Sequence, residues 1–254
     1  MIEQLAAPAR AVGGFFEMAL DTFTKMWRRP FQFREFFEQT WMIARVSLVP
    51  TLLVAIPFTV LVAFTLNILL REIGAADLSG AGTAFGTVTQ LGPVVTVLVV
   101  AGAGATAICA DLGARTIREE IDAMRTIGVS PMEALVIPRM LAAIVMMPLL
   151  GFFSTVVSII GGGMFCWISL EMPPITFVQR LQEVIPITDL WVGLLKAPVF
   201  GAIIAMTGCF QGMLVEGNAE QVGLRTTSAV VQAIFLVIVL DAFFAVFFSQ
   251  IGWI

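Results

Sequence analysis

Residues that could carry out chemistry are few in this chain, and they are unevenly placed. The 254 residues include no histidine and three cysteines, Cys109, Cys166 and Cys209, each inside or beside an apolar run and none in a CxxC pair. Such cysteines are typical of small buried side chains rather than of metal or disulfide sites. One carboxylate, Asp241, stands near the middle of an apolar run. A charge is costly there, so Asp241 predicts either a functional site or a structural hydrogen bond to a neighbouring helix.

The densest group of charges lies between residues 111 and 139, DLGARTIREEIDAMRTIGVSPMEALVIPR, between two runs without charge, 78–110 and 140–170. Apolar residues recur in it at helical spacing, and opposite charges stand three or four positions apart on the other face. This pattern predicts an amphipathic helix outside the bilayer, over 115–137. The apolar positions are Ile117, Ile121, Met124 and Ile127, and the expected ion pairs are Arg115–Glu119, Arg118–Asp122 and Asp122–Arg125.

Two features should divide this segment. Gly128 is placed to end the first helix as a left-handed cap, and Ser130-Pro131-Met132-Glu133 resembles the start of a second helix, with the serine as N-cap. Pro138 cannot donate to the helical ladder, so the chain is expected to change direction at Arg139 before it enters the membrane. A solvated, salt-bridged loop helix without a partner is the simpler alternative.

The composition sets the class of protein. With 59% hydrophobic and 13% charged residues, the chain is too apolar for an ordinary soluble domain. Its long apolar runs predict an all-α polytopic membrane protein with five transmembrane helices. The expected spans are 46–70, 86–110, 140–170, 196–215 and 228–250.

Two amphipathic segments precede the first span. Residues 1–30 predict a membrane-surface segment, and residues 31–45 predict a helix lying in the interface plane, with a soluble helix packed on a partner as the alternative. The apolar stripe of the second segment contains Phe33, Phe36, Phe37 and Trp41.

The distribution of lysine and arginine predicts the topology. Eleven of these residues fall in the N-terminal segment, in 111–139 and in 216–227, against three (Arg71, Arg180 and Lys196) in the segments on the opposite side. The positive-inside bias therefore places the N-terminus and the 111–139 segment in the cytoplasm and the C-terminus outside.

The sequence also limits the possible sources of energy. It contains no GxxxxGK[ST] loop, so the usual phosphate-binding site for ATP is absent from this chain. A separate ATPase docked on 111–139 could drive transport, or Asp241 could couple transport to an ion gradient. A scaffold without transport activity is a third possibility, and a membrane-embedded enzyme is disfavoured because no carboxylates cluster at an interface.

Two stretches carry a resemblance to a known family. They are LGPVVTVLVVAGAGATAICADLGARTIREEIDAMRTIGVSPMEALVIPR and EGNAEQVGLRTTSAVVQ, and they resemble the MlaE/YrbE permeases of bacterial ABC lipid transporters, which work with MCE proteins. The most specific matches are ExIDAxxxxGVxP at 119–131, followed by Pro138-Arg139, and VGxxTT at 222–227. The wording of 102–122 is similar to that of actinobacterial, mycobacterial Mce systems. Ala103 departs from the family, where many members have arginine, and Gly217-Asn218-Ala219 stands where a GGA-type stretch is usual.

The resemblance implies an assembly in the cytoplasmic (inner) membrane. Two permease subunits, with a heterodimer favoured by the second departure, would sit on two ATPase subunits that use ATP and Mg²⁺. This chain itself would bind no cofactor and no nucleic acid. An MCE hexamer would lie outside, with its spans against 31–45, and the cargo would be a lipid: phospholipid, fatty or mycolic acid and sterol all fit, in either direction. The residues implied in ATPase coupling are Arg118, Glu119, Asp122, Arg125, Pro131, Glu133 and Arg139.

Overall fold

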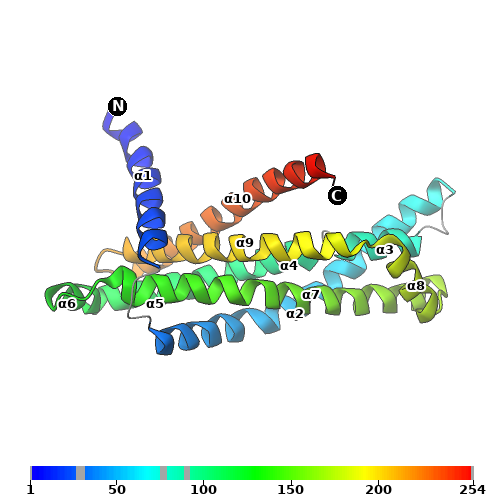
Figure 1. Ribbon diagram of the computed structural model, residues 1–254, viewed down its shortest axis with the longest axis horizontal. Helices are drawn as coiled ribbons and strands as arrows, with labels where there is room; N and C mark the ends of the chain where they lie inside the picture. Colours follow the sequence, from blue (N-terminus) through cyan, green and yellow to red (C-terminus); the bar gives the residue numbers. More distant parts are fainter. Residues whose placement is uncertain (1, 27–31, 75–78, 89–91, 253–254) are drawn as a thin grey trace.

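The computed structural model describes residues 2–26, 32–74, 79–88 and 92–252, which are helical almost throughout and form no strand (Figure 1). Five helical stretches in these residues are long and apolar enough to cross a membrane. The predicted all-α polytopic class is therefore confirmed. The five stretches are Phe33–Glu72, Gly92–Ile117, Met132–Ser169, Thr188–Met213 and Ala219–Ile251.

Most of the helices run along one axis of the molecule. One end of the bundle carries α6 and the turn at 214–218, and the other carries α3 and α8 (Figure 1); we call these the α6 end and the α8 end. The elements, with η for a π-helical turn, are α1 (Ile2–Lys25), α2 (Phe33–Glu72), α3 (Ser79–Gly86), α4 (Gly92–Val99), η3 (Val100–Gly104), α5 (Ala105–Ile117), α6 (Glu120–Thr126), η4 (Met132–Val136), α7 (Ile137–Leu170), α8 (Pro174–Val184), α9 (Ile187–Met213) and α10 (Ala219–Ile251).

Small and polar side chains, not large apolar ones, fill the contact between α2 and α7. A Cβ added at Gly162 of α7 would lie 3.3 Å from Thr59 Cγ2 of α2, and Ser154 and Ser158 of α7 are fully buried. Small residues let helices approach closely in lipid, where van der Waals packing holds them together, and rows of residues four apart interdigitate. Apart from Ile43, the large apolar side chains of α2 are exposed or half-buried. The buried residues of α2, each four after the last, are Gln39, Ile43, Ser47, Thr51, Ala55, Thr59, Ala63 and Asn67.

Glycines bring α9 against its neighbours in the same way. A Cβ added at Gly201 would lie 2.5 Å from the carbonyl oxygen of Ala143 in α7. One added at Gly212 would lie 2.8 Å from Leu112 Cβ in α5. Helix α9 therefore packs between α5 and α7 at distances that only glycine permits.

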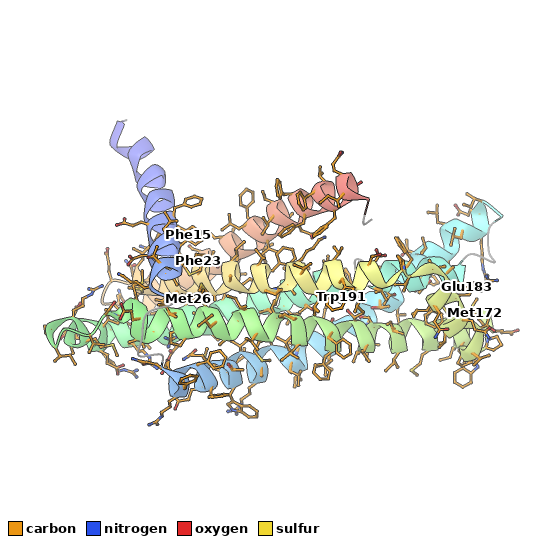
Figure 2. All side chains as sticks on the ribbon, viewed as in Figure 1. Phe15, Phe23, Met26, Met172, Glu183 and Trp191 are labelled. Carbon is orange, nitrogen blue, oxygen red and sulfur yellow. The ribbon has the colours of Figure 1, made fainter. Side chains whose placement is uncertain are left out.

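The segment 31–45, predicted as a separate helix in the interface plane, belongs instead to the first long helix. Residues 33–45 are not a separate helix in the interface plane: they form the first turns of α2, which continues without a break to Glu72. Gln39 and Ile43 begin the same buried stripe that Ser47 continues, so packing extends the span past the charges of this segment. Helix α1 meets the bundle near the α6 end and projects away from it toward the N-terminus, with Phe15, Phe23 and Met26 on the part nearer the bundle (Figure 2).

Three other spans also start or end beyond the charge-free runs. The second runs from Gly92 through η3 to Ile117, the fourth starts at Ile187 instead of 196, and the last starts at Ala219 instead of 228. In each case the added residues include charges, several of which have partners inside the bundle. The third span confirms the expected single long helix.

The 118–131 connector is divided more finely than the sequence predicted. Helix α5 ends at Ile117, Glu119 adopts a left-handed conformation (φ 58°), and α6 follows. Gly128 (φ 80°) ends α6, as expected for a left-handed cap. Pro138 causes no break, because the widened turn η4 lies directly before it and the helix continues into α7.

Candidate functional site

A buried arginine joins three helices at the α6 end. The side chain of Arg139 in α7 is 0% exposed. Its Nη1 donates a hydrogen bond to the Leu135 carbonyl oxygen at 2.8 Å, and its Nη2 donates to the carboxylate of Asp111 in α5. The same Nη2 lies 3.4 Å from a carboxylate oxygen of Glu35 in α2. The two ends of the connector and the first span thus share one cation.

A second arginine balances the charge. Arg115 Nε lies 3.3 Å from Asp111, and its Nη2 lies 3.8 Å from Glu35. Glu35, Asp111, Arg115 and Arg139, the Arg139 cluster, are formally neutral. Removing one member of such a buried set leaves an uncompensated charge, which is strongly destabilising. The cluster therefore fixes how α2, α5 and α7 sit relative to one another.

This burial corrects the role predicted for Arg139. Its side chain is enclosed and cannot contact another protein directly. The other residues predicted for ATPase coupling do reach the surface: Glu119 and Glu133 are exposed and Pro131 is half-buried. The side chains of Arg118, Asp122 and Arg125 are 61%, 69% and 58% exposed, respectively.

One of the three expected ion pairs on the connector forms as predicted. Arg125 Nη1 donates to Asp122 Oδ1 at 2.9 Å. The other two are replaced: Arg118 pairs with Glu120 at 2.8 Å, and Arg115 turns inward to the Arg139 cluster. The left-handed residue Glu119 explains the change, because it interrupts the helical spacing on which both expected pairs depended.

Asp241 has a charged partner. Lys196 Nζ of α9 donates to Asp241 Oδ1 at 3.2 Å, and the lysine side chain is 14% exposed. The same ammonium lies 6.0 Å from the centroid of the Phe248 ring. The structural alternative set by the sequence is confirmed, since the pair links α9 to α10; the pair also borders a cavity, and a functional role for Asp241 stays a prediction.

That cavity has a volume of about 360 Å³ and lies among α4, α7, α9 and α10, with α3 and α8 at its α8 end. Lys196 and Asp241 line it together with Asp189, and most of the remaining wall is apolar. An apolar chamber with one ion pair in its wall is chemically suited to an amphiphile, whose tail the wall excludes from water and whose head the pair can hold. Representative apolar lining residues are Val94, Val97, Met147, Phe152, Leu194 and Phe200.

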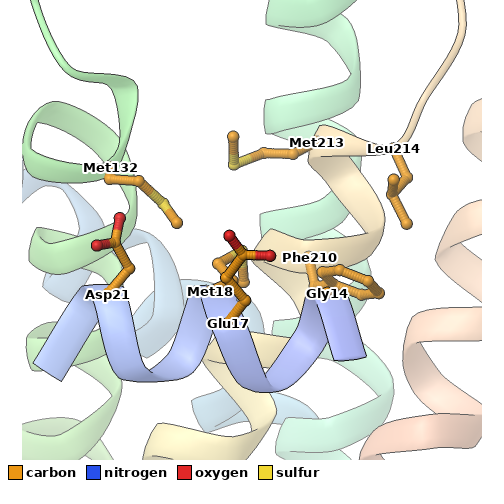
Figure 3. Close-up of a pocket in the computed structure, with 8 residues that line it drawn as sticks. All are labelled: Gly14, Glu17, Met18, Asp21, Met132, Phe210, Met213 and Leu214. Atoms are coloured by element: carbon orange, nitrogen blue, oxygen red, sulfur yellow. The ribbon is translucent and has the colours of Figure 1, made fainter. Parts of the chain in front are cut away.

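A smaller cavity of about 280 Å³ separates α1 from the bundle at the α6 end (Figure 3). Met18, Met132 and Met213 line it, and Glu17 and Asp21 project from α1 toward it. Asp21 is already bound by Lys25, whose Nζ lies 2.6 Å from its Oδ2. This pocket therefore belongs to the contact between α1 and the bundle.

In the part of the chain that the structure describes, no three His, Cys, Asp or Glu side chains are grouped to hold an ion. Cys109, Cys166 and Cys209 are buried free thiols.

The fold and these sites define a polytopic α-helical membrane protein with ion pairs held inside the bundle. A family model described as "Permease MlaE" matches residues 36–247, and the chain belongs to that permease family. It is 32% identical over 170 residues to a "Probable ABC transporter permease protein" of Synechocystis, covering 67% of this chain and 65% of that relative, less than two thirds of its length. A Rickettsia bellii protein of the same description is 28% identical over 91% of this chain and 89% of its own. The chloroplastic protein TRIGALACTOSYLDIACYLGLYCEROL 1 of Arabidopsis thaliana is 30% identical over 63% of this chain and 46% of its own.

Proposed function

We propose that this permease is the membrane subunit of an ATP-driven lipid transporter. The observation that carries the proposal is the apolar cavity beside the Lys196–Asp241 pair, because a lipid needs both a dry wall and a place for its headgroup. The name of the Arabidopsis relative, which refers to a glycerolipid, supports the same class of cargo. Phospholipid, fatty or mycolic acid and sterol remain the candidate cargoes, in either direction.

The energy comes from a separate ATPase that docks on the connector. Helix α6, at the tip of the bundle (Figure 1), presents the exposed Asp122 and Arg125. The exposed Arg118 lies before this helix and the exposed Glu133 after it. Glu119 and Pro131 shape the two ends of this surface. Arg139 does not contact the ATPase. Its ion pairs connect α7 to α2 and α5, so a tilt of the connector moves these three helices together. ATP and Mg²⁺ bind the partner, and this chain binds no cofactor.

The proposed topology places the α6 end in the cytoplasm and the C-terminus outside, in a cytoplasmic membrane, on the lysine and arginine distribution. A second permease subunit, in a heterodimer, and an MCE hexamer of actinobacterial type complete the assembly. Phe33, Phe37 and Trp41 are 66%, 65% and 70% exposed on α2 and offer a surface to the MCE spans. Phe36 is half-buried against the core, so it offers less of its side chain to this surface.

Charge reversal on the connector tests the ATPase docking. The double variant Asp122→Arg/Arg125→Glu, in the complex purified from native membranes, should lose the ATPase or its lipid transport. The matched control is Arg180→Glu/Glu183→Arg on α8, a pair with the same spacing and the same 2.9 Å distance at the opposite end of the bundle. Transport that survives the first double variant unchanged, in a preparation without any ATPase, contradicts the proposal.

The partly buried Lys196–Asp241 pair also favours a second candidate, an ion-coupled carrier. That carrier would move lipid in sealed vesicles with an ion gradient and no nucleotide, and Asp241→Asn would abolish the flux. ATP-dependent flux that persists when the gradient is collapsed excludes it. A scaffold without transport activity would show no flux under either condition.

A further inference from the structure

A second group of polar side chains lies in the contact between α9 and α10, at the α6 end. Gln211 of α9 is 3% exposed, and its Nε2 donates to Gln232 Oε1 of α10 at 2.8 Å. Arg225 Nη1, also on α10, donates to Gln211 Oε1 at a long 3.4 Å. Arg225 and Gln232 are seven residues apart, so they share one face of the helix.

The charge of Arg225 is not balanced by this arrangement. Its side chain is half-buried, and none of the ion pairs in the described parts of the chain includes it. One weak bond to a neutral amide uses little of the capacity of a guanidinium, which offers five donors and favours carboxylate and phosphate. The contrast with Arg139 is direct, since that arginine lies near two carboxylates. A partly desolvated cation held near a membrane surface without an acid indicates an anion that comes from outside the chain.

The surroundings of Arg225 identify the kind of anion. On the same helix, Leu224 and Val231 are 64% and 62% exposed, so an exposed apolar face of α10 lies next to the face that carries Arg225. An anion that carries an acyl chain could pack its tail there, while a small soluble anion would gain nothing from this surface.

The position of Arg225 relates it to the cavity. Arg225 and Asp241 are 16 positions apart on α10, about 24 Å at 1.5 Å per residue. The α9–α10 contact therefore carries one cation near the α6 end and another, Lys196, beside the cavity. Polar groups therefore lie at two positions along the length of the α9–α10 contact.

We propose that Arg225, with the amides of Gln211 and Gln232, binds the phosphate or carboxylate headgroup of an anionic lipid at the α6 end of the α9–α10 contact. The inference rests on the proposed lipid transport, and it names the charge class of the cargo at the α6 end of the permease. Gln211 and Gln232 position the guanidinium, and the exposed apolar face of α10 receives the tail.

Equilibrium lipid binding without nucleotide tests this site. The purified complex is placed in phosphatidylcholine vesicles with a minor fraction of spin-labelled phosphatidylglycerol, and the preference for the anionic lipid is read from the immobilised signal. Arg225→Gln should lower that preference about fivefold, the usual effect of one basic side chain at a membrane surface, and Arg225→Lys should restore part of it. Arg34→Gln is the control: Arg34 lies at the same end of the bundle, 93% exposed and paired with Glu38.

The outcomes separate the possibilities. An unchanged preference in Arg225→Gln, with an unfolding temperature equal to that of the native complex, overturns the proposal and leaves Arg225 a structural link between α9 and α10. Equal losses in Arg225→Gln and Arg34→Gln also overturn it, because the effect is then general surface charge. Displacement of the spin label by inorganic phosphate assigns the site to a free anion instead of a lipid. Because no ATP is present, a failure of ATP-driven transport would not change this result.

Discussion

Arg139 in α7 donates a hydrogen bond to Asp111 in α5, and the two residues stand on opposite sides of the 118–131 connector in the sequence. The connector is therefore closed at its base by an ion pair between the enclosed Arg139 and the partly exposed Asp111. Because Glu35 of α2 lies 3.4 Å from the same guanidinium, a force on α6 reaches three helices at once. A connector without this link could bend without moving the spans.

Removing one member of the Arg139 cluster should destabilise the fold strongly. Asp111→Asn leaves the enclosed guanidinium short of a carboxylate, and the expected loss is about 3–5 kcal/mol of unfolding free energy. Arg118→Gln, on the exposed face of the same connector, should change stability by no more than about 0.5 kcal/mol. Denaturant unfolding in detergent measures both. Similar values for the two variants would show that the cluster is solvated.

Variants of the Lys196–Asp241 pair should affect stability and lipid transport differently. Each single variant, Lys196→Met or Asp241→Leu, leaves a charge unpaired beside an apolar cavity, so each should lower the unfolding temperature. The double variant removes both charges and should recover most of the stability, as a double-mutant cycle can measure. Lipid transport should not recover, because the cavity then lacks its ion pair. Full transport by the double variant would assign the pair a purely structural role.

The sequence predicted the number of spans well and their ends poorly, for a physical reason. Charge-free runs mark the part of a helix that faces lipid, but a helix can extend past them where its charges find partners in the bundle. Arg115 and Asp111 lie four apart and could be paired from spacing alone. The contribution of Glu35 could not be foreseen, because it depends on α2 continuing through residue 45 and packing beside α7. The partner of Asp241, 45 positions away, is likewise set by the packing of α9 on α10.

Two glycines on α9 offer a matched test of close helix packing. Gly201→Ala would place a methyl group 2.5 Å from the Ala143 carbonyl oxygen, so the helices must separate, at a cost of about 1–3 kcal/mol. A Cβ at Gly193, on the same helix, meets no atom within 4 Å among the described residues, and Gly193→Ala should be neutral or stabilising by up to about 1 kcal/mol through helix propensity. Thermal unfolding of the two variants measures the difference. Equal effects would mean that α7 and α9 are further apart than the structure places them.

Cysteine labelling should place the two ends of the bundle on opposite sides of the membrane. Thr126 on α6 and Glu183 on α8 are both exposed, and the three native cysteines are buried free thiols that should stay unlabelled. In intact cells, an impermeant maleimide should modify Glu183→Cys and spare Thr126→Cys, because lysine and arginine concentrate toward the α6 end. After the membrane is opened, both should react, which controls for accessibility. Labelling of Thr126→Cys in intact cells would place α6 outside, where no ATPase could drive it.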